Sequence, residues 1–178
     1  MKLSTYAPSN IQEIKQLFTK TFSDSEGQSE GLLIGNLVYD LMTRTNEDDL
    51  YGFVATKNKK IIGCIFFSKL TFVSKISAFL LSPVAIHTKY QKKGIGQKLI
   101  HFGLNTLKEN GTEQVFTYGD PNFYSKVGFN LITEKIAKAP FKLSQPEGWL
   151  ALSLVSDEVK STSGNPCCVE AFNKPEIW

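Results

Sequence analysis

The chain has 178 residues, of which 42% are hydrophobic and 21% are charged, and its formal net charge at pH 7 is +3. This composition is typical of one globular domain and excludes an intrinsically disordered chain. The small net charge gives no reason to expect nucleic-acid binding, and no apolar run approaches the roughly 18 residues of a membrane span.

The first quarter of the chain predicts one short strand and two amphipathic helices. Residues 3–6 predict the strand, and residues 11–22 predict a helix whose apolar side chains share one face. A polar loop is expected over residues 23–30. A second helix is expected over residues 31–43, with these side chains facing inward: Leu33, Leu37, Val38 and Leu41. The opening sequence MKLSTYAPSNIQEIK lacks the apolar core of a signal peptide, so we expect a cytoplasmic protein without a membrane partner.

The next three predicted elements are strands. Residues 50–57 and 60–72 predict two strands joined by a hairpin turn at Asn58-Lys59. Residues 77–87 predict a longer strand with Pro83 in its middle. Because proline has no N–H group for a sheet ladder, Pro83 predicts a bulge or an edge position.

The run Gln91-Lys92-Lys93-Gly94-Ile95-Gly96 separates that strand from a helix predicted over residues 95–110. The order of strand, glycine loop and helix directs several backbone N–H groups and a helix N-terminus at one point, which predicts an anion site for a phosphate or pyrophosphate. Glycine allows a close ligand approach and unusual φ values. A simple turn is the alternative interpretation of the two glycines.

Two other phosphate-binding motifs do not fit this loop. A Walker loop needs a Lys-Ser/Thr pair after its second glycine, and Gln97-Lys98 stands there instead. The dinucleotide fingerprint needs a third glycine or alanine where this chain has Leu99. The loop therefore indicates a nucleotide-like ligand held in a different way.

The remaining elements are shorter. Gly111 is the predicted C′ residue of the preceding helix, and residues 113–118 predict a strand. Asp120 is a good N-cap and Pro121 a good first residue for a short helix that continues to residue 126. Strands are expected over residues 129–133 and 149–156. We expect one domain over residues 1–156 and a tail over residues 157–178 that packs on or extends it.

Two segments of the chain resemble the GNAT superfamily of N-acetyltransferases. VAIHTKYQKKGIGQKLI resembles the acetyl-CoA loop of that family, and TYGDPNFYSKVGFN resembles its later Tyr-x-x-x-Gly-Phe motif, with Tyr124 and Phe129 at the ends. The run GDP-x-x-Tyr, which ends at Tyr124, resembles the corresponding run in the YhbS-like branch of bacterial predicted N-acetyltransferases. The resemblance covers residues 1–155 and is strongest over residues 81–129.

The resemblance implies a fold and a cosubstrate. The implied fold class is α/β (α+β), with a central mixed, mostly antiparallel sheet that is flanked by helices and whose fourth and fifth strands splay apart. The implied cosubstrate is acetyl-CoA, with its pantetheine arm in the splay, and no metal is implied. Cofactor contacts are expected from the end of the fourth strand and from the glycine loop: Val84, Ala85, Ile86, His87, Gln91, Lys92, Lys93, Gly94, Ile95, Gly96 and Gln97.

The resemblance also implies direct transfer of an acetyl group from the thioester to a primary amine in a ternary complex. Tyr124 matches the tyrosine of the family that protonates the departing thiolate; the alternative is that Tyr124 only packs on its short helix. Ser82 is the polar candidate on the fourth strand for ordering a water that acts as base, or it is simply a hydrogen-bonded serine. We expect His87 to contact the loop or the cofactor and His101 to be solvated.

The acceptor is expected to be a small-molecule or peptide amine, bound by a monomer or a homodimer. Glu26, Glu30 and Asp40 lie where related folds form one wall of the acceptor pocket, and they either attract a cationic amine or are only solvated. Phe141 and Trp149 either stack on an acceptor or pack in the core.

Two other functions stay open at the level of sequence. One is a non-catalytic acyl-CoA-binding sensor or regulatory module, and the other is a phosphate-binding nucleotide protein. The cysteines suggest no further chemistry: Cys64 lies in an apolar run, and Cys167 and Cys168 are adjacent without metal-ligand or CxxC spacing. We expect reduced thiols and no metal site.

Overall fold

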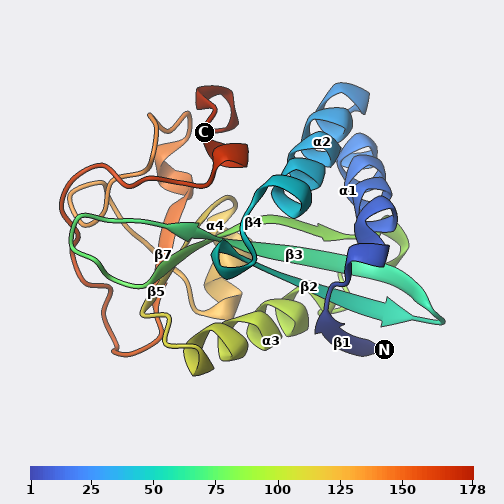
Figure 1. The fold of residues 1–178 in the computed structure, drawn as a ribbon, viewed down its shortest axis with the longest axis horizontal. Helices are drawn as coiled ribbons and strands as arrows, with labels where there is room; N and C mark the ends of the chain where they lie inside the picture. The colour runs from blue at the N-terminus through green and yellow to red at the C-terminus, as the bar shows by residue number, and fades with distance from the viewer. The chain divides into compact units, whose positions relative to one another are not determined.

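A computed structural model describes residues 1–178 and contains one mixed sheet with the strand order β1-β2-β3-β4-β5-β7-β6 (Figure 1). The ladder between β4 and β5 is parallel, whereas the ladders β1–β2, β5–β7 and β6–β7 are antiparallel. This sheet confirms the expected α/β (α+β) fold class. In chain order the elements are β1 (Lys2–Thr5), α1 (Ile11–Glu26), α2 (Gln28–Arg44), β2 (Leu50–Lys57), β3 (Lys60–Leu70), β4 (Ala78–Ile86), α3 (Ile95–Glu109), β5 (Gln114–Tyr118), α4 (Pro121–Tyr124), β6 (Asn130–Leu131) and β7 (Trp149–Ser153).

The chain divides into two compact units. The first contains Met1–Phe66 and Pro83–Gly103, and the second contains Phe67–Ser82 and Leu104–Trp178. The strands β3 and β4 and the helix α3 therefore each contribute residues to both units. No helix of the chain combines the length and apolar character that crossing a membrane requires.

In the first unit, α1 and α2 lie side by side (Figure 1). Their close approach depends on Gly35, because a Cβ atom there would collide with Oγ1 of Thr19. Phe18 of α1 packs on Phe66 of β3 with 6.0 Å between ring centroids. Apolar burial of this kind is the main stabilising contribution to such a unit.

The polar loop expected over residues 23–30 is wrong. The first helix continues to Glu26, and α2 begins at Gln28 directly after Gly27, whose φ of 100° breaks the helix. The polar residues before Gly27 form the exposed end of α1, where Ser25 Oγ donates to the carbonyl of Thr21 at 3.2 Å. A polar helix end on the surface has the composition of a loop, so composition misled the prediction.

Leu33 was expected to face inward, and this expectation is also wrong, because 40% of the residue is exposed. The buried face of α2 includes Gly31 and Gly35 as well as Leu37, Val38 and Leu41. Two of the positions on this face are glycines, which have no apolar side chain. The apolar pattern of the sequence therefore indicated a slightly different buried face, one that included Leu33. The other three predicted inward side chains are buried.

The structure confirms two predicted local features, the hairpin turn at Asn58-Lys59 and the helix end at Gly111. Asn58 and Lys59 have φ values of 51° and 62°, so the hairpin between β2 and β3 has the positive φ at both central residues that a type I′ turn needs. Gly111 has a φ of 81°, and its N–H donates to the Lys108 carbonyl at 3.1 Å. Gly111 thus takes the left-handed C′ conformation that ends α3.

In the second unit, the parallel ladder between β4 and β5 is short. It pairs Ala78 with Gln114 at one end and Leu81 with Thr117 at the other. The rest of β4, to Ile86, extends beyond the ladder. The pairing of the fourth strand with the fifth thus ends before the fourth strand does. Pro83 lies just beyond the last pair of this ladder, so the expectation of a bulge or an edge at Pro83 stays a prediction, although β4 as a whole lies between β3 and β5.

Three predicted strand ends were too long. The third strand ends at Leu70 because Thr71 pairs instead with Cys167, through two backbone hydrogen bonds of 2.9 Å. The sixth strand keeps only Asn130–Leu131, the two residues with partners on β7. The seventh ends at Ser153, whose Oγ accepts from the N–H of Ser156 at 3.1 Å in a turn. In each case a nonlocal pairing or a turn replaces the predicted extension.

The C-terminal residues pack within the second unit. Trp178 is 6% exposed, and its indole N–H donates to the carbonyl of Phe172 at 3.0 Å. Its ring stacks on Tyr118 at 6.3 Å and meets Trp149 edge-on at 6.2 Å. The tail thus covers aromatic residues from the end of β5 and the start of β7.

Candidate active site

At the end of β4, alternate residues direct their main-chain N–H and C=O groups towards β3 and away from it. The N–H of His87, directly after β4, donates to the carbonyl of Ile62 on β3 at 2.9 Å. Successive residues of a strand direct their N–H and C=O groups to opposite sides. The main-chain groups of Val84 and Ile86 therefore point to the other side, where the ladder with β5 does not extend.

The side chain of Gln91 confirms that no strand occupies that side at Ile86. Its Nε2 atom donates to the Ile86 carbonyl at 3.0 Å, which is the place that a ladder partner would take. Along this part of β4, Pro83 and Ala85 are buried, and Val84 and Ile86 are half-buried. On this side the main chain at Val84 and the N–H of Ile86 have no ladder partner on β5, whereas the Ile86 carbonyl is bound by Gln91.

The glycine loop leads directly into the first turn of α3. Lys92 and Gly94 have φ values of 58° and 73°, and a Cβ atom at Gly94 would meet no other atom within 4 Å. The N–H of Lys98 donates to the Gly94 carbonyl at 3.1 Å. The three preceding N–H groups, on residues 95–97, belong to the first turn of the helix and have no partner inside it. This geometry suits an anion, as the sequence predicted.

Basic and aromatic side chains support the loop from the short turn before it, Thr88–Tyr90. Lys93 Nζ donates to the carbonyl of Lys89 at 3.0 Å and lies 5.4 Å from the ring centroid of Tyr90. His87 caps this turn, because its Nδ1 accepts from the N–H of Lys89 at 3.2 Å. The imidazole is therefore engaged in shaping the loop, and Lys92 is exposed beside it.

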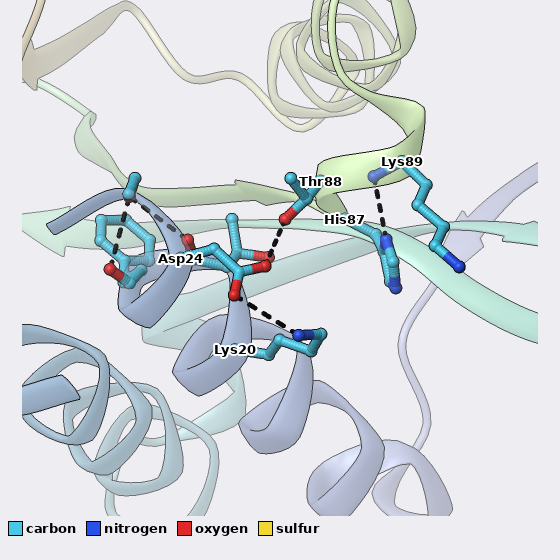
Figure 2. A network of polar contacts seen from close by, with 8 residues as sticks. Lys20, Asp24, His87, Thr88 and Lys89 are labelled. Carbon is cyan, nitrogen blue, oxygen red and sulfur yellow. Dashed lines mark hydrogen bonds and ion pairs between the residues drawn. The ribbon is translucent and has the colours of Figure 1, made fainter. Parts of the chain in front are cut away.

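A polar network ties the end of α1 to the same turn (Figure 2). Thr88 Oγ1 donates to Asp24 Oδ2 at 2.7 Å, and Lys20 Nζ lies 3.4 Å from Asp24 Oδ1. The hydrogen bond from Thr88 holds the pKa of the Asp24 carboxyl below its ordinary value. The sequence did not indicate this contact, because it placed Asp24 in a loop and the two residues are far apart along the chain.

In the second unit, α4 places Tyr124. Asp120 is its N-cap, as predicted, and accepts from the N–H of Asn122 at 2.9 Å. Tyr124 is 9% exposed, and its ring meets Phe129 edge-on at 5.8 Å. A Cβ atom at Gly119 would lie 2.7 Å from Cε2 of Tyr124, so the ring lies directly against the glycine backbone. The ring of Tyr124 thus packs against both Gly119 and Phe129.

The pKa of the Tyr124 phenol depends on burial and on the side chains of Thr117 and Asp120. Thr117 is fully buried, and its Oγ1 donates to the carbonyl of Leu81 at 2.8 Å. Burial is the largest cause of a raised pKa of the Tyr124 phenol; Thr117 lowers that pKa and Asp120 raises it. The phenol is therefore protonated at neutral pH. The sequence analysis did not identify Thr117 or Gly119. The one sequence signal for Thr117 is that it is a polar residue within the strand QVFTY.

The other predicted site residues occupy varied positions. Ser82 is half-buried and follows Leu81, the last paired residue of β4. Trp149 is fully buried, so it packs in the core as the alternative interpretation held, and Phe141 is half-buried. His101 is exposed on α3 as expected.

The acidic residues on α1 and α2 have different neighbours. The pKa of Glu26 is raised, first by burial and then by Glu30. Asp40 lies 3.6 Å from Arg44 one helical turn later. No group of three or more His, Cys, Asp or Glu side chains is arranged to hold a metal ion.

Comparison with known proteins gives the same family in sequence and in structure. The family model described as acetyltransferase (GNAT) domain matches residues 48–131. The uncharacterized N-acetyltransferase YhbS of Escherichia coli K12 is 32% identical over 136 residues, which are 74% of this chain and 74% of YhbS.

Solved structures of two relatives have the same fold. The crystal structure of Escherichia coli YhbS in complex with CoA has a TM-score of 0.80 and 26% sequence identity, covering 97% of this chain and 92% of YhbS. A GNAT family acetyltransferase from Brucella melitensis in complex with acetyl-CoA has a TM-score of 0.74 and 22% identity, covering 96% of this chain and 97% of that protein.

Proposed function

Because the chain belongs to the GNAT family of N-acetyltransferases, we propose that it transfers an acetyl group from acetyl-CoA to a primary amine by direct attack in a ternary complex. The observation that carries this proposal is the continuous main-chain edge from Val84 through the glycine loop to the first turn of α3. An extended ligand with amide groups at one end and a pyrophosphate at the other matches that edge in chemistry and in order.

Each part of the edge has a proposed role. The N–H groups of residues 94–97 bind the pyrophosphate, with Lys92 adding positive charge. The main-chain groups of Val84 and the N–H of Ile86 pair with the pantetheine arm and supply an N–H donor for the thioester carbonyl. Ala85, His87, Gln91 and Lys93 shape the edge rather than contact the reacting atoms.

The acetyl-CoA supplies the acetyl group as a reactive thioester. We assign the proton for the departing thiolate to Tyr124, whose buried phenol has a raised pKa and so carries its proton at neutral pH. Ser82, at the point where the β4–β5 ladder ends, orders a water that takes the proton of the amine. The amine is a small molecule or the amino group of a peptide, bound in the cytoplasm by a monomer or a homodimer.

One observation favours a second candidate, a non-catalytic acyl-CoA-binding module. The strand β4, AFLLSPVAI, contains no carboxylate or imidazole that would act as a general base. A protein that only senses acyl-CoA needs the main-chain edge and no base.

A thiol-release assay separates the two candidates. The protein is incubated with acetyl-CoA and a panel of amines, amino acids and peptides, and the released thiol and the acetylated product are both measured. We expect turnover on at least one acceptor and a loss of about 100-fold in kcat for Tyr124→Phe. Tyr6→Phe is the control, because Tyr6 lies on the N-terminal segment and contacts Phe66. Tight acetyl-CoA binding without turnover on any acceptor would favour the sensing module.

A further inference from the structure

The hydroxyls of Tyr118 and Ser144 form a pair at the end of β5. Their oxygen atoms lie 2.8 Å apart, and either one can be the donor. The main-chain N–H of Gln145 donates to the phenolic oxygen of Tyr118 at 2.7 Å. On another side, the ring of Tyr118 stacks on Trp178 with 6.3 Å between the ring centroids. Tyr118 is therefore held by the loop before β7 and by the C-terminal tail, all within the second unit.

One hydroxyl hydrogen of this pair has no partner within the protein. The two hydroxyls carry two hydrogens, and only one of them lies in the hydrogen bond between Tyr118 and Ser144. The hydrogen bond from Gln145 uses a lone pair of Tyr118 and no hydrogen of the pair. Ser144 is exposed and Tyr118 is half-buried, so the remaining hydrogen can reach water or a ligand. The pair therefore offers one hydrogen-bond donor at the surface.

Tyr118 and Tyr124 lie on opposite faces of the sheet. A Cβ atom at Gly119 would lie 2.7 Å from Cε2 of Tyr124, so Tyr124 covers the face to which residue 119 would direct a side chain. The N–H of Gly119 donates to the Gly148 carbonyl at 2.9 Å, which continues the β5–β7 ladder by one residue. Because successive residues of a strand direct their side chains to opposite faces, Tyr118 faces away from Tyr124.

Ser82 shares the face of Tyr118 at the end of the β4–β5 ladder. Leu81 and Thr117 form the last pair of this ladder, so the next residues in register are Ser82 and Tyr118. Residues that are neighbours in register direct their side chains to the same face of a sheet. The serine that we propose to order a water thus lies on the face of Tyr118, and the proposed acid, Tyr124, lies on the other.

The two faces match the two sides of an acetyl transfer. The acid must lie beside the departing sulfur, and the amine must reach the carbonyl carbon from another direction, because sulfur and nitrogen are both bonded to that carbon in the tetrahedral intermediate. Since Tyr124 packs against Gly119 on the face of the sulfur, the opposite face is left for the acceptor. Ser82 lies on this second face, where the amine has to lose a proton.

We propose that the Tyr118–Ser144 pair binds the acceptor on this face and donates its remaining hydroxyl hydrogen to a carbonyl or carboxylate oxygen beside the attacking amine. The acceptor class is then an amino acid or a peptide N-terminus, in which only two carbon atoms separate the amine nitrogen from such an oxygen. The loop charges agree, because exposed Lys138 and Lys142 outnumber one exposed carboxylate, Glu147, and so disfavour a polycationic acceptor.

This inference rests on the proposed acetyl transfer, and its test compares matched acceptors. The wild type is assayed with a panel of amino acids, their amides and dipeptides, and with the amines that differ from these amino acids only in lacking the carboxyl group. The kcat, the KM for the acceptor and the KM for acetyl-CoA are measured. We expect kcat/KM to be about 10- to 100-fold higher for the acceptors with the carbonyl or carboxylate, which is the effect of one hydrogen bond to such an oxygen.

Two variants remove the pair, and two serve as controls. Tyr118→Phe removes the phenolic oxygen and keeps the ring that stacks on Trp178. Ser144→Ala removes the second hydroxyl, and Ser144→Thr restores it. Ser156→Ala is the matched control, because it breaks a hydroxyl pair with Ser153, whose oxygens lie 2.9 Å apart, at the other end of β7. Thermal unfolding checks that each variant folds.

We expect Tyr118→Phe and Ser144→Ala to raise the KM for the amino acid or peptide about tenfold. The KM for the matched amine and the KM for acetyl-CoA stay unchanged, because neither ligand uses this donor. A change in the shape of the loop alone would instead raise the KM of both matched acceptors. Ser144→Thr should restore the wild-type KM, and Ser156→Ala should change none of the values.

The outcomes separate this inference from the proposed function. If the wild type acetylates no amine, the proposed function fails, and this inference fails with it. If the wild type acetylates amines without preferring those with a carbonyl or carboxylate, only this inference is overturned. Equal losses for both members of a matched acceptor pair would also overturn it. If Tyr118→Phe does not fold, Ser144→Ala, at an exposed position, decides between these outcomes.

Discussion

The Oγ1 atom of Thr117 lies 2.8 Å from the carbonyl oxygen of Leu81, at the last pair of the parallel ladder between β4 and β5. Burial raises the pKa of the Tyr124 phenol, and the same threonine lowers it. One buried side chain therefore lies at the end of the ladder and also affects the pKa of the group that we propose as the acid.

Replacement of Gly94 by alanine should weaken coenzyme A binding. Gly94 has a φ of 73°, which costs a residue with a side chain about 1–2 kcal/mol, so the expected loss of affinity is about tenfold. Isothermal titration calorimetry measures it. The control is Gly111→Ala, because Gly111 has a φ of 81° and similarly open surroundings but ends α3 away from its N-terminus. Equal losses of affinity in both variants would contradict a role for the loop in binding.

Asp24→Asn should loosen the turn that precedes the glycine loop. The variant exchanges the charged partner of the Thr88 hydroxyl for a neutral one, and we expect the KM for acetyl-CoA to rise about threefold while kcat is kept. Asp48→Asn is the control, since Asp48 is exposed at the surface. A fall in kcat at constant KM would contradict a role of Asp24 in supporting the glycine loop for acetyl-CoA binding.

The pKa of Asp24 predicts how the hydrogen bond between Thr88 and Asp24 responds to acid. Because Thr88 lowers the pKa of Asp24, the contribution of this contact is present above the ordinary carboxyl pKa of about 4 and is lost as the pH falls through the lowered value. Coenzyme A affinity of the wild type and of Thr88→Val should therefore converge only in strong acid. Convergence near neutral pH would contradict this assignment.

The buried phenol of Tyr124 predicts a loss of stability in alkali. Its pKa is raised in the folded protein, chiefly by burial, so its contribution is full below the ordinary tyrosine pKa of about 10 and is lost as the pH rises through the folded value. Urea unfolding of the wild type should show this decline above about pH 10. The free energy of unfolding of Tyr124→Phe should decline less steeply with pH. Identical pH dependence in the two proteins would contradict the titration of a buried Tyr124 phenol.

Trp178→Ala should destabilise the second unit. The variant removes a side chain that is 6% exposed, together with its hydrogen bond to Phe172, and the expected cost is about 3–5 kcal/mol. Chemical denaturation measures the change, and Val73→Ala, at a position that is 72% exposed, is the control. An unchanged free energy of unfolding would mean that the tail is not part of the cooperative core.

Much of the fold follows from short-range chemistry, and these parts were predictable. The turn at Asn58-Lys59, the helix end at Gly111 and the N-cap at Asp120 each depend on residues within a few positions of one another. The glycine loop is similar, because its φ values and the start of α3 are local properties.

The contacts that complete the candidate site are nonlocal, and no local pattern indicates them. Thr117 and Leu81 meet only because β4 and β5 pair in one register, and Asp24 reaches Thr88 only because α1 continues past its expected end. Trp178 was assigned to a tail, yet its burial depends on aromatic residues of β5 and β7. Periodicity describes one element at a time and carries no information on such partners.

The most direct test of the account is the rate of thiol release from acetyl-CoA by the wild type and by Tyr124→Phe, measured with the acceptor on which the wild type turns over fastest. We predict thiol release equal to acetylated amine formed in the wild type, and a kcat about 100-fold lower in the variant at an unchanged affinity for coenzyme A. Equal rates in the two proteins, or acetyl-CoA binding without acetylated product on every amine, would contradict the proposed acetyl transfer through Tyr124.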